Sequence, residues 1–249
     1  MNRRPTFPAR LNAPSAPAAP RTATAAAAAA PAGGVGLDSQ AVRLRMVQRL
    51  AAQGIRDQRV LSAMGAVQRH RFVDTALANQ AYEDTSLPIG LGQTISKASV
   101  VARMVELLLG PSSGKLGRVL EIGTGCGYQA AVLSLVAKEV YSVERLRLLH
   151  EKARDNLRPF RLPNVHLLFG DGMAGYARGA PYAGIIAAAG GDAVPQAWCD
   201  QLAVGGRIVA PTQMPGGQQA LVVIEKTSAG MQQSVLEAVH FVPLKSGIA

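Results

Sequence analysis

The chain has 249 residues, of which 48% are hydrophobic and 17% charged, and its formal net charge is +10. This length suits one α/β domain with or without a tail. No run reaches the ~18 apolar residues that a membrane span needs, so we expect no membrane partner. Cys126 and Cys199 lie outside any CxxC motif or Cys/His cluster, which predicts free thiols, no metal site and a cytoplasmic location.

Residues 1–36 consist mostly of Ala, Pro, Thr and Gly, with four arginines and no acid. A segment with so little to bury predicts a disordered tail. Residues 37–249 are predicted to form a single, monomeric domain with three parts. These are a helical region with a long loop at 37–114, a strand-helix core at 115–212 and a β region at 213–249.

Positive charge is densest between Arg43 and Arg71, where seven arginines accompany one acid, Asp57. The arginines alternate with apolar residues at helical spacing, which favours the solvated face of amphipathic helices. A surface that attracts anions or RNA is the alternative. Because no aromatic residues are interleaved for base stacking, no nucleic acid is expected as a partner.

The order of elements predicts an α/β fold. Apolar spacing predicts helices at 38–54, 57–67 and 99–109, with an irregular stretch at 81–93 and no strand before Gly114. Strand-helix alternation then predicts a doubly wound, mostly parallel sheet with helices on both faces. Its strands are expected at 119–122, 139–144, 165–169, 185–188 and 207–210. Two later β-rich runs, 220–226 and 234–242, predict an antiparallel hairpin at the sheet edge.

The sharpest local signal is the run Glu121-Ile122-Gly123-Thr124-Gly125-Cys126-Gly127 between a strand and a helix. The dinucleotide fingerprint G-x-G-x-x-G needs a glycine where this chain has Tyr128. The carboxylate of Glu121 would repel a pyrophosphate and attract the amino group of a methionine moiety. The loop therefore favours S-adenosylmethionine over NAD, although glycine-rich turns also serve as plain connectors.

Two more acids end the next two predicted strands. Glu144 can accept hydrogen bonds from both ribose hydroxyls, and Asp171, which precedes Gly172, can accept one from the adenine amino group. Each has a structural alternative: a helix cap or salt bridge for Glu144, and an Asp-Gly turn for Asp171. The loop after the fourth strand lacks the Asn/Asp-Pro-Pro-aromatic tetrad of base N-methyltransferases, which leaves ribose and other RNA targets open.

The chain resembles the protein-L-isoaspartate O-methyltransferase family of class I S-adenosylmethionine-dependent methyltransferases over residues 40–245. The resemblance rests on the following segments: Ala81-Tyr82-Glu83-Asp84, Leu87-Pro88-Ile89-Gly90, Gly92-Gln93-Thr94-Ile95-Ser96, Val119-Leu120-Glu121-Ile122-Gly123-Thr124-Gly125, Ser142-Val143-Glu144-Arg145, Gly170-Asp171-Gly172 and Phe241-Val242-Pro243-Leu244. It implies a Rossmann-like methyltransferase fold. The core at 115–212 would bind the cofactor, and the loop within 37–114 would bind the substrate.

The implied reaction transfers a methyl group from S-adenosylmethionine to the carboxylate of L-isoaspartyl residues, and of D-aspartyl residues, in damaged proteins. The ester then closes to a succinimide, whose hydrolysis restores some normal aspartate. The partners are thus isoaspartyl-containing proteins and peptides. An ionised carboxylate needs no general base, so the protein's task is alignment and water exclusion.

The resemblance also implies a role for each matched residue. Ser96 is the active-site serine, whose hydroxyl orients the attacking carboxylate; its alternative is a cap for the following helix. The residues implied in cofactor binding are Thr94, Ile95, Ser99, Glu121, Gly123, Gly125, Glu144, Arg145, Asp171, Gly172 and Gln219. Those implied in substrate binding are Thr94, Ser96, Val242, Pro243 and Leu244.

The chain departs from the family pattern at three places. Lys97-Ala98 replaces the usual Gln/Ala-Pro pair, Ala183 replaces an aspartate, and Gly190-Gly191-Asp192 lacks the usual proline. Two alternatives therefore stay open. One is an S-adenosylmethionine-dependent methyltransferase of another substrate, such as RNA or a small molecule, and the other is a non-catalytic homologue that binds the cofactor.

Overall fold

The computed structural model describes residues 40–249, so the predicted tail and the predicted caps Asp38 and Ser39 lie outside the described residues. The helices are α1 (Gln40–Ala52), α2 (Gln58–Ala66), α3 (Ala98–Leu109), α4 (Tyr128–Val136), α5 (Arg147–Leu157) and α6 (Gln196–Gln201). The strands are β1 (Leu87–Gly90), β2 (Gln93–Ile95), β3 (Leu116–Ile122), β4 (Ala137–Glu144), β5 (Val165–Phe169), β6 (Tyr182–Ala187), β7 (Leu202–Gln213), β8 (Gln219–Thr227) and β9 (Gly230–Val239).

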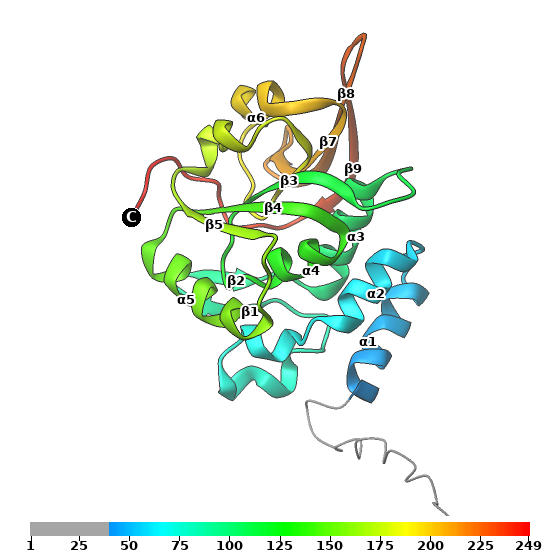
Figure 1. The fold of residues 1–249 in the computed structure, drawn as a ribbon, viewed down its shortest axis with the longest axis vertical. Helices are drawn as coiled ribbons and strands as arrows, with labels where there is room; N and C mark the ends of the chain where they lie inside the picture. The colour runs from blue at the N-terminus through cyan, green and yellow to red at the C-terminus, as the bar shows by residue number, and fades with distance from the viewer. Residues whose placement is uncertain (1–39) are drawn as a thin grey trace, which may run out of the picture. The chain divides into compact units, whose positions relative to one another are not determined.

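A seven-stranded sheet forms the centre of this region, in the order β5-β4-β3-β6-β7-β8-β9 (Figure 1). The strands from β5 to β7 are parallel, whereas β8 and β9 pair antiparallel at one edge. The chain builds outward from β3 to β5 and then returns to place β6 on the other side of β3. Such a switch point opens a crevice at the carboxyl ends of the strands. The predicted doubly wound sheet and its C-terminal hairpin are confirmed.

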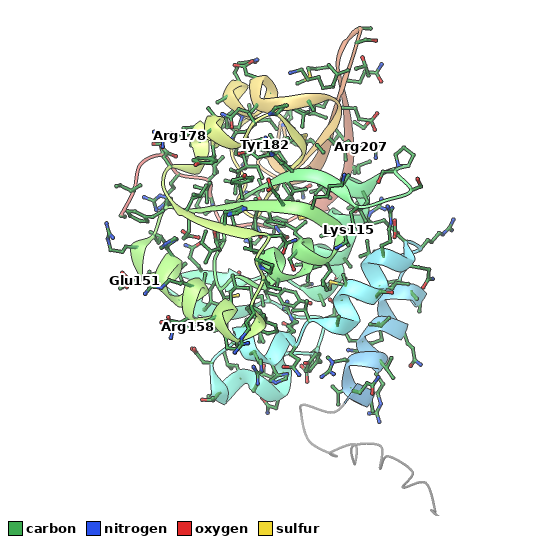
Figure 2. All side chains as sticks on the ribbon, viewed as in Figure 1. Lys115, Glu151, Arg158, Arg178, Tyr182 and Arg207 are labelled. Atoms are coloured by element: carbon green, nitrogen blue, oxygen red, sulfur yellow. The ribbon has the colours of Figure 1, made fainter. Side chains whose placement is uncertain are left out.

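Successive residues of the central strands point to opposite faces, and each face has its own core. Val119 packs with residues of α3 and α4, whereas its neighbour Leu120 packs with Trp198 and Tyr182. Figure 1 shows α3, α4 and α5 on one side of the sheet and α6 on the other. Tyr182 points into the interior, while Arg158 projects outward beyond the end of α5 (Figure 2).

The N-terminal helices follow the predicted apolar spacing. In α1, Met46 and Leu50 are buried. The Asp57 side chain caps α2 by accepting a hydrogen bond from the backbone N of Arg59 at 2.8 Å. Of the arginines in this region, those at 45, 49, 56 and 71 are exposed as expected, whereas Arg69 is completely buried. The prediction of a solvated face is thus wrong for Arg69, because its side chain is enclosed between the backbone of Ala81 and Ser96 and the ring of Tyr128.

The prediction that no strand precedes Gly114 is wrong. The stretch taken as irregular contains the hairpin β1–β2, which pairs Leu87 with Ile95 and Pro88 with Thr94 in a sheet of its own. Pro88 and a turn with three consecutive positive φ angles, at Gly90, Leu91 and Gly92, hide the strand pattern in the sequence. This hairpin carries the residues that precede Ser96, so its position decides where the serine lies.

Candidate active site

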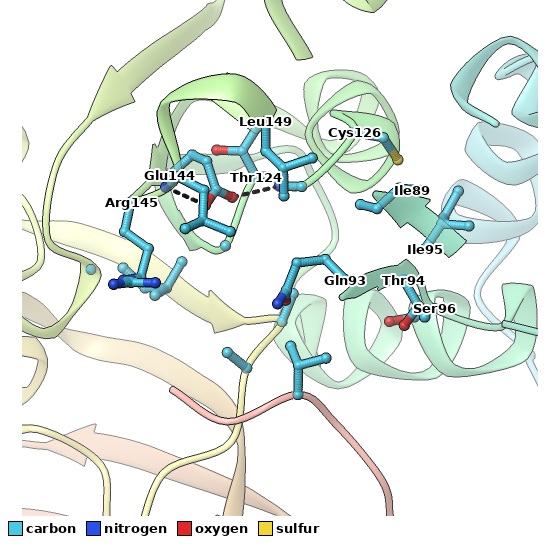
Figure 3. Close-up of a pocket in the computed structure, with 18 of the residues that line it drawn as sticks. Ile89, Gln93, Thr94, Ile95, Ser96, Thr124, Cys126, Glu144, Arg145 and Leu149 are labelled. Carbon is cyan, nitrogen blue, oxygen red and sulfur yellow. Dashed lines mark hydrogen bonds between the residues drawn. The ribbon is translucent and has the colours of Figure 1, made fainter. Parts of the chain in front are cut away.

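A cavity of about 490 Å³ opens at the carboxyl ends of the central strands. Its walls come from the hairpin and the Ser96 loop, the glycine loop after β3, the end of β4, the loop after β6 and residues 242–245. Figure 3 shows Thr94 and Ser96 at one end and Glu144 and Arg145 at the other, with the Gln93 side chain between them. The cavity therefore joins the two groups of predicted residues, which are distant in the sequence.

Most of the predicted site residues line this cavity, but four do not. The lining includes Thr94, Ile95, Ser96, Gly123, Gly125, Glu144, Arg145, Gly172, Val242, Pro243 and Leu244. Ser99, Glu121, Asp171 and Gln219 lie outside it, each held by other contacts described below.

The glycine loop turns sharply from β3 into α4. Gly123 and Gly125 have φ angles of 89° and 57°, which residues other than glycine rarely adopt. A Cβ atom at Gly125 would also lie 3.2 Å from Cδ1 of Ile89 in the hairpin. Close approach of the hairpin to the loop therefore depends on the missing side chain.

Glu144 ends β4 with its carboxylate at the cavity wall. Its Oε2 atom accepts from the backbone N of Gly125 at 2.9 Å, and its Oε1 atom accepts from the backbone N of Leu146 at 2.9 Å (Figure 3). Although only 5% of the residue is exposed, each oxygen has a further lone pair for a ligand hydroxyl. This geometry suits an acceptor for a vicinal diol.

Glu121 lies directly below the glycine loop and is fully buried. The parallel register pairs it with Ser142, whose hydroxyl donates to Oε2 and lies 2.6 Å from the hydroxyl oxygen of Thr124. Its Oε1 atom has no hydrogen-bond partner among the described residues. Burial is the main cause that raises the pKa of the Glu121 carboxyl to about 8. A cation bound nearby would favour its ionised form.

Asp171 uses both carboxylate oxygens to bind backbone amides. One accepts from Met173 N at 2.8 Å, and the other from Gly247 N at 2.7 Å. These bonds hold its side chain outside the cavity lining, and the following Gly172 lines the cavity instead. A Cβ atom at Gly172 would lie 2.5 Å from Cγ2 of Ile122, so only glycine fits without displacing that side chain.

The other two residues outside the lining support the walls. Ser99 N donates to Asp84 Oδ1 at 3.0 Å at the start of α3. Gln219 Oε1 accepts from Phe241 N at 2.7 Å, just before the segment 242–244. Gly190 fixes that segment from the other side, because its N donates to Val242 O at 2.9 Å and its O accepts from Leu244 N at 2.7 Å.

The cavity lining also contains residues that sequence reasoning did not assign, among them Ile89, Gln93, Leu149 and Lys245. Gln93 belongs to the family-specific Gln-Thr-Ile-Ser segment, so a signal for it was present. The apolar residues on the buried face of α5 did not indicate that Leu149 would line the cavity. Lys245 follows the last matched residue of the Val-Pro-Leu segment and brings a cation to the cavity wall.

The cavity fits a nucleoside cofactor by size and by donor chemistry. Its volume lies in the range of ~300–1,000 Å³ typical of small-molecule sites. Glu144 has free lone pairs at the cavity wall that suit a ribose diol, whereas the buried Glu121 does not line the cavity and precedes the lining residues Ile122 and Gly123 in the chain. Among residues 40–249, no group of three or more His, Cys, Asp or Glu side chains could hold a metal ion. Fold and site together define a Rossmann-like methyltransferase that uses S-adenosylmethionine.

The comparisons with known proteins identify the family. Residues 41–249 match the family model described as protein-L-isoaspartate(D-aspartate) O-methyltransferase. A protein-L-isoaspartate O-methyltransferase from Methylibium petroleiphilum is 63% identical over 217 residues, which are 86% of this chain and 81% of the relative. The chain belongs to the protein-L-isoaspartate(D-aspartate) O-methyltransferase family, and the predicted activity and methyl donor are confirmed.

Two solved structures share the fold. A protein-L-isoaspartate O-methyltransferase superposes with a TM-score of 0.75 at 28% identity, over 83% of this chain and 67% of the other. A protein from Plasmodium falciparum, described as a putative member of the same family in complex with S-adenosyl-L-homocysteine, gives a TM-score of 0.70 at 22% identity. This match covers 98% of the Plasmodium falciparum chain and 82% of this chain. Across the described part of the chain, no helix is long and apolar enough to cross a membrane.

Proposed function

We propose that Ser96 aligns an isoaspartyl carboxylate with the methyl group of S-adenosylmethionine held between the glycine loop and Glu144. The observation that carries this proposal is the single cavity that Ser96, Gly123 and Glu144 line together. Ser96 and Glu144 stand at its opposite ends (Figure 3). An acceptor and a donor bound at these ends would meet between them.

The cofactor supplies an electrophilic methyl group on a positively charged sulfur. The acceptor carboxylate is ionised at neutral pH, so the chain need not remove a proton from it. The Ser96 hydroxyl donates a hydrogen bond to one carboxylate oxygen and leaves the other free to face the methyl group. Thr94 and Ile95 lie next to the path by which the carboxylate approaches. Ile95 is buried and anchors the strand, whereas Thr94 is exposed beside the serine.

The donor end is held by residues with different tasks. Glu144 accepts from the ribose hydroxyls, since two backbone amides already fix its carboxylate. Gly123, Gly125 and Gly172 provide backbone that a ligand can approach closely. Glu121 attracts the ligand's amino group from below the loop, and Asp171 acts indirectly by ordering the backbone around Gly172.

The acceptor end is completed by Val242, Pro243 and Leu244. Hydrogen bonds to Gly190 keep this segment extended along the cavity wall. An extended segment of this kind suits a peptide substrate, whose backbone can lie alongside it. We infer that the substrate is an L-isoaspartyl residue, or a D-aspartyl residue, in a damaged protein, with no nucleic acid as partner.

We expect the chain to act as a monomer in which residues 37–249 form one domain. Cys126 and Cys199 are free thiols, which suits a reducing compartment such as the cytoplasm.

The deciding experiment measures tritiated methyl transfer from S-adenosylmethionine to an isoaspartyl peptide and to its aspartyl twin. We expect incorporation with the isoaspartyl peptide and near-background counts with the twin. Equal incorporation would show that the site does not select the displaced carboxylate. No incorporation, together with cofactor binding by calorimetry, would identify a non-catalytic homologue.

A further inference from the structure

Arg69 is a buried cation at the junction of three parts of the active site. Its side chain is 0% exposed. The Nε atom donates to Ala81 O at 2.8 Å, and Nη2 donates to Ser96 O at 2.7 Å. Its guanidinium carbon lies 4.7 Å from the ring centre of Tyr128, which lines the cavity.

No carboxylate of the described residues forms an ion pair with this charge. None of the ion pairs formed within residues 40–249 involves Arg69. Its Nη1 atom is buried without a hydrogen-bond partner in the same region. Burying a guanidinium group without a carboxylate is costly, and here two hydrogen bonds to backbone carbonyls and the face of Tyr128 offset that cost. The choice of arginine at this position therefore calls for an explanation in terms of the segments that these contacts join.

The contacts of Arg69 supply that explanation. Ala81 lies six residues before the hairpin β1–β2 and Ser96 directly follows it, so one guanidinium group joins the segment that leads to the hairpin with the residue that ends it. Tyr128 is the first residue of α4, directly after the glycine loop. The same side chain thus ties the loop that carries Ser96 to the helix that begins at the cofactor loop.

We propose that Arg69 is a positioning residue for methyl transfer, which fixes the backbone of Ser96 relative to the glycine loop. This inference rests on the proposed function of Ser96. Alignment is the main contribution that the chain can make when the acceptor is already ionised, and a displacement of ~1 Å can cost about 100-fold in rate. Arg69 acts through the Ser96 carbonyl and is not assigned a contact with either substrate.

The test compares Arg69→Met and Arg69→Lys with the wild type. Methionine keeps apolar contact with Tyr128 but donates no hydrogen bond to Ala81 or Ser96. We expect Arg69→Met to lower kcat toward an isoaspartyl peptide about 100-fold. The Kd for S-adenosylhomocysteine should change little. The midpoint of urea unfolding should fall, because the carbonyls of Ala81 and Ser96 lose their donor, so kcat is measured under conditions in which the variant is fully folded. Arg69→Lys keeps a single cationic donor and should recover part of kcat.

Arg71→Met is the matched control, because Arg71 lies in the same 3-10 turn with its side chain exposed. It should retain wild-type kcat. Wild-type kcat in Arg69→Met, or a loss of kcat that only parallels losses of cofactor affinity and stability, would overturn the proposal. Should Arg69→Met not fold, Arg69→Lys decides: full wild-type kcat contradicts the inference and a selective kcat loss supports it. Failure of the proposed function would show differently, as a wild-type enzyme that does not methylate the isoaspartyl peptide.

Discussion

Glu144 and Gly125 are joined across the mouth of the cofactor cleft by a hydrogen bond of 2.9 Å from the glycine amide to the carboxylate. Glu144 ends β4, and Gly125 lies in the loop that follows the neighbouring strand β3, so the bond fixes the spacing between the glycine loop and the carboxylate at the cavity wall. The carboxylate is thereby oriented before any ligand arrives. This preorganisation makes Glu144 the clearest place to test the donor side of the site.

Glu144→Ala should weaken binding of S-adenosylhomocysteine about 100-fold or more. Hydrogen bonds to a charged acceptor contribute ~1.5–3 kcal/mol each, and the variant loses both ribose contacts and the bond to Gly125. Calorimetric titration measures the effect. Glu139→Gln, at the start of the same strand and in an exposed ion pair with Arg118, is the control and should bind normally. Unchanged affinity in Glu144→Ala would contradict the assigned role.

Ser96→Ala should lower kcat toward the isoaspartyl peptide about tenfold to a hundredfold. The estimate follows from the loss of one hydrogen bond to a charged carboxylate. Cofactor affinity should be unaffected, because the serine lies at the opposite end of the cavity from Glu144. Steady-state kinetics measure the change in kcat. The control is Ser113→Ala, which alters an exposed serine beyond α3. A helix-capping role alone would reduce stability and leave kcat intact.

Glu121 should make stability depend on pH. Its pKa in the folded chain is about 8, against an ordinary value of 4.5, so the folded state keeps a proton that the unfolded state releases between these values. The contribution to the free energy of unfolding is therefore full below about 4.5 and is lost as the pH rises through about 8. Glu121→Gln stays neutral at every pH. The free energy of unfolding of this variant, minus that of the wild type, should therefore rise as the pH increases from about 4.5 to about 8. Urea unfolding of both proteins at several pH values measures the difference, and parallel curves would refute the raised pKa.

Cofactor binding should also release protons if Glu121 becomes ionised beside the ligand's amino group. The expected number lies between zero and one per ligand below a pH of about 8. Calorimetry in two buffers with different ionisation enthalpies measures it. Glu121→Gln should abolish the buffer dependence; a dependence that survives this change would point to another group.

Gly172→Ala should damage both stability and cofactor affinity. The new methyl group would lie 2.5 Å from Ile122 Cγ2, so the Ile122 side chain, which lines the cavity, must shift. Overpacking of this kind costs ~1–3 kcal/mol. Thermal unfolding and calorimetry measure the two effects. Gly114→Ala, where the new Cβ would meet nothing within 4 Å, should leave both unchanged.

Local signals were sufficient for the sheet and for the position of the cofactor loop. Buried parallel strands read as continuous apolar runs, and Gly123 to Gly127 mark the turn at the carboxyl edge. The hairpin β1–β2 was missed because Pro88 and the positive φ angles at its turn interrupt the alternation of Leu87 and Ile89.

Contacts between distant residues explain the remaining differences. Asp171 is held outside the cavity lining by a hydrogen bond from the backbone N of Gly247, and no local sequence pattern predicts that bond. The burial of Arg69 likewise depends on Ala81, Ser96 and Tyr128 coming together in three dimensions. In the sequence it is indistinguishable from its exposed neighbour Arg71.

The hairpin that leads into Ser96 shares no strand pairing with the seven-stranded sheet that carries the glycine loop and Glu144. Under the proposed roles, the serine that aligns the acceptor and the acid that holds the donor's ribose therefore belong to two different sheets. Substitutions confined to the hairpin are expected to change the choice of acceptor more than the affinity for the donor.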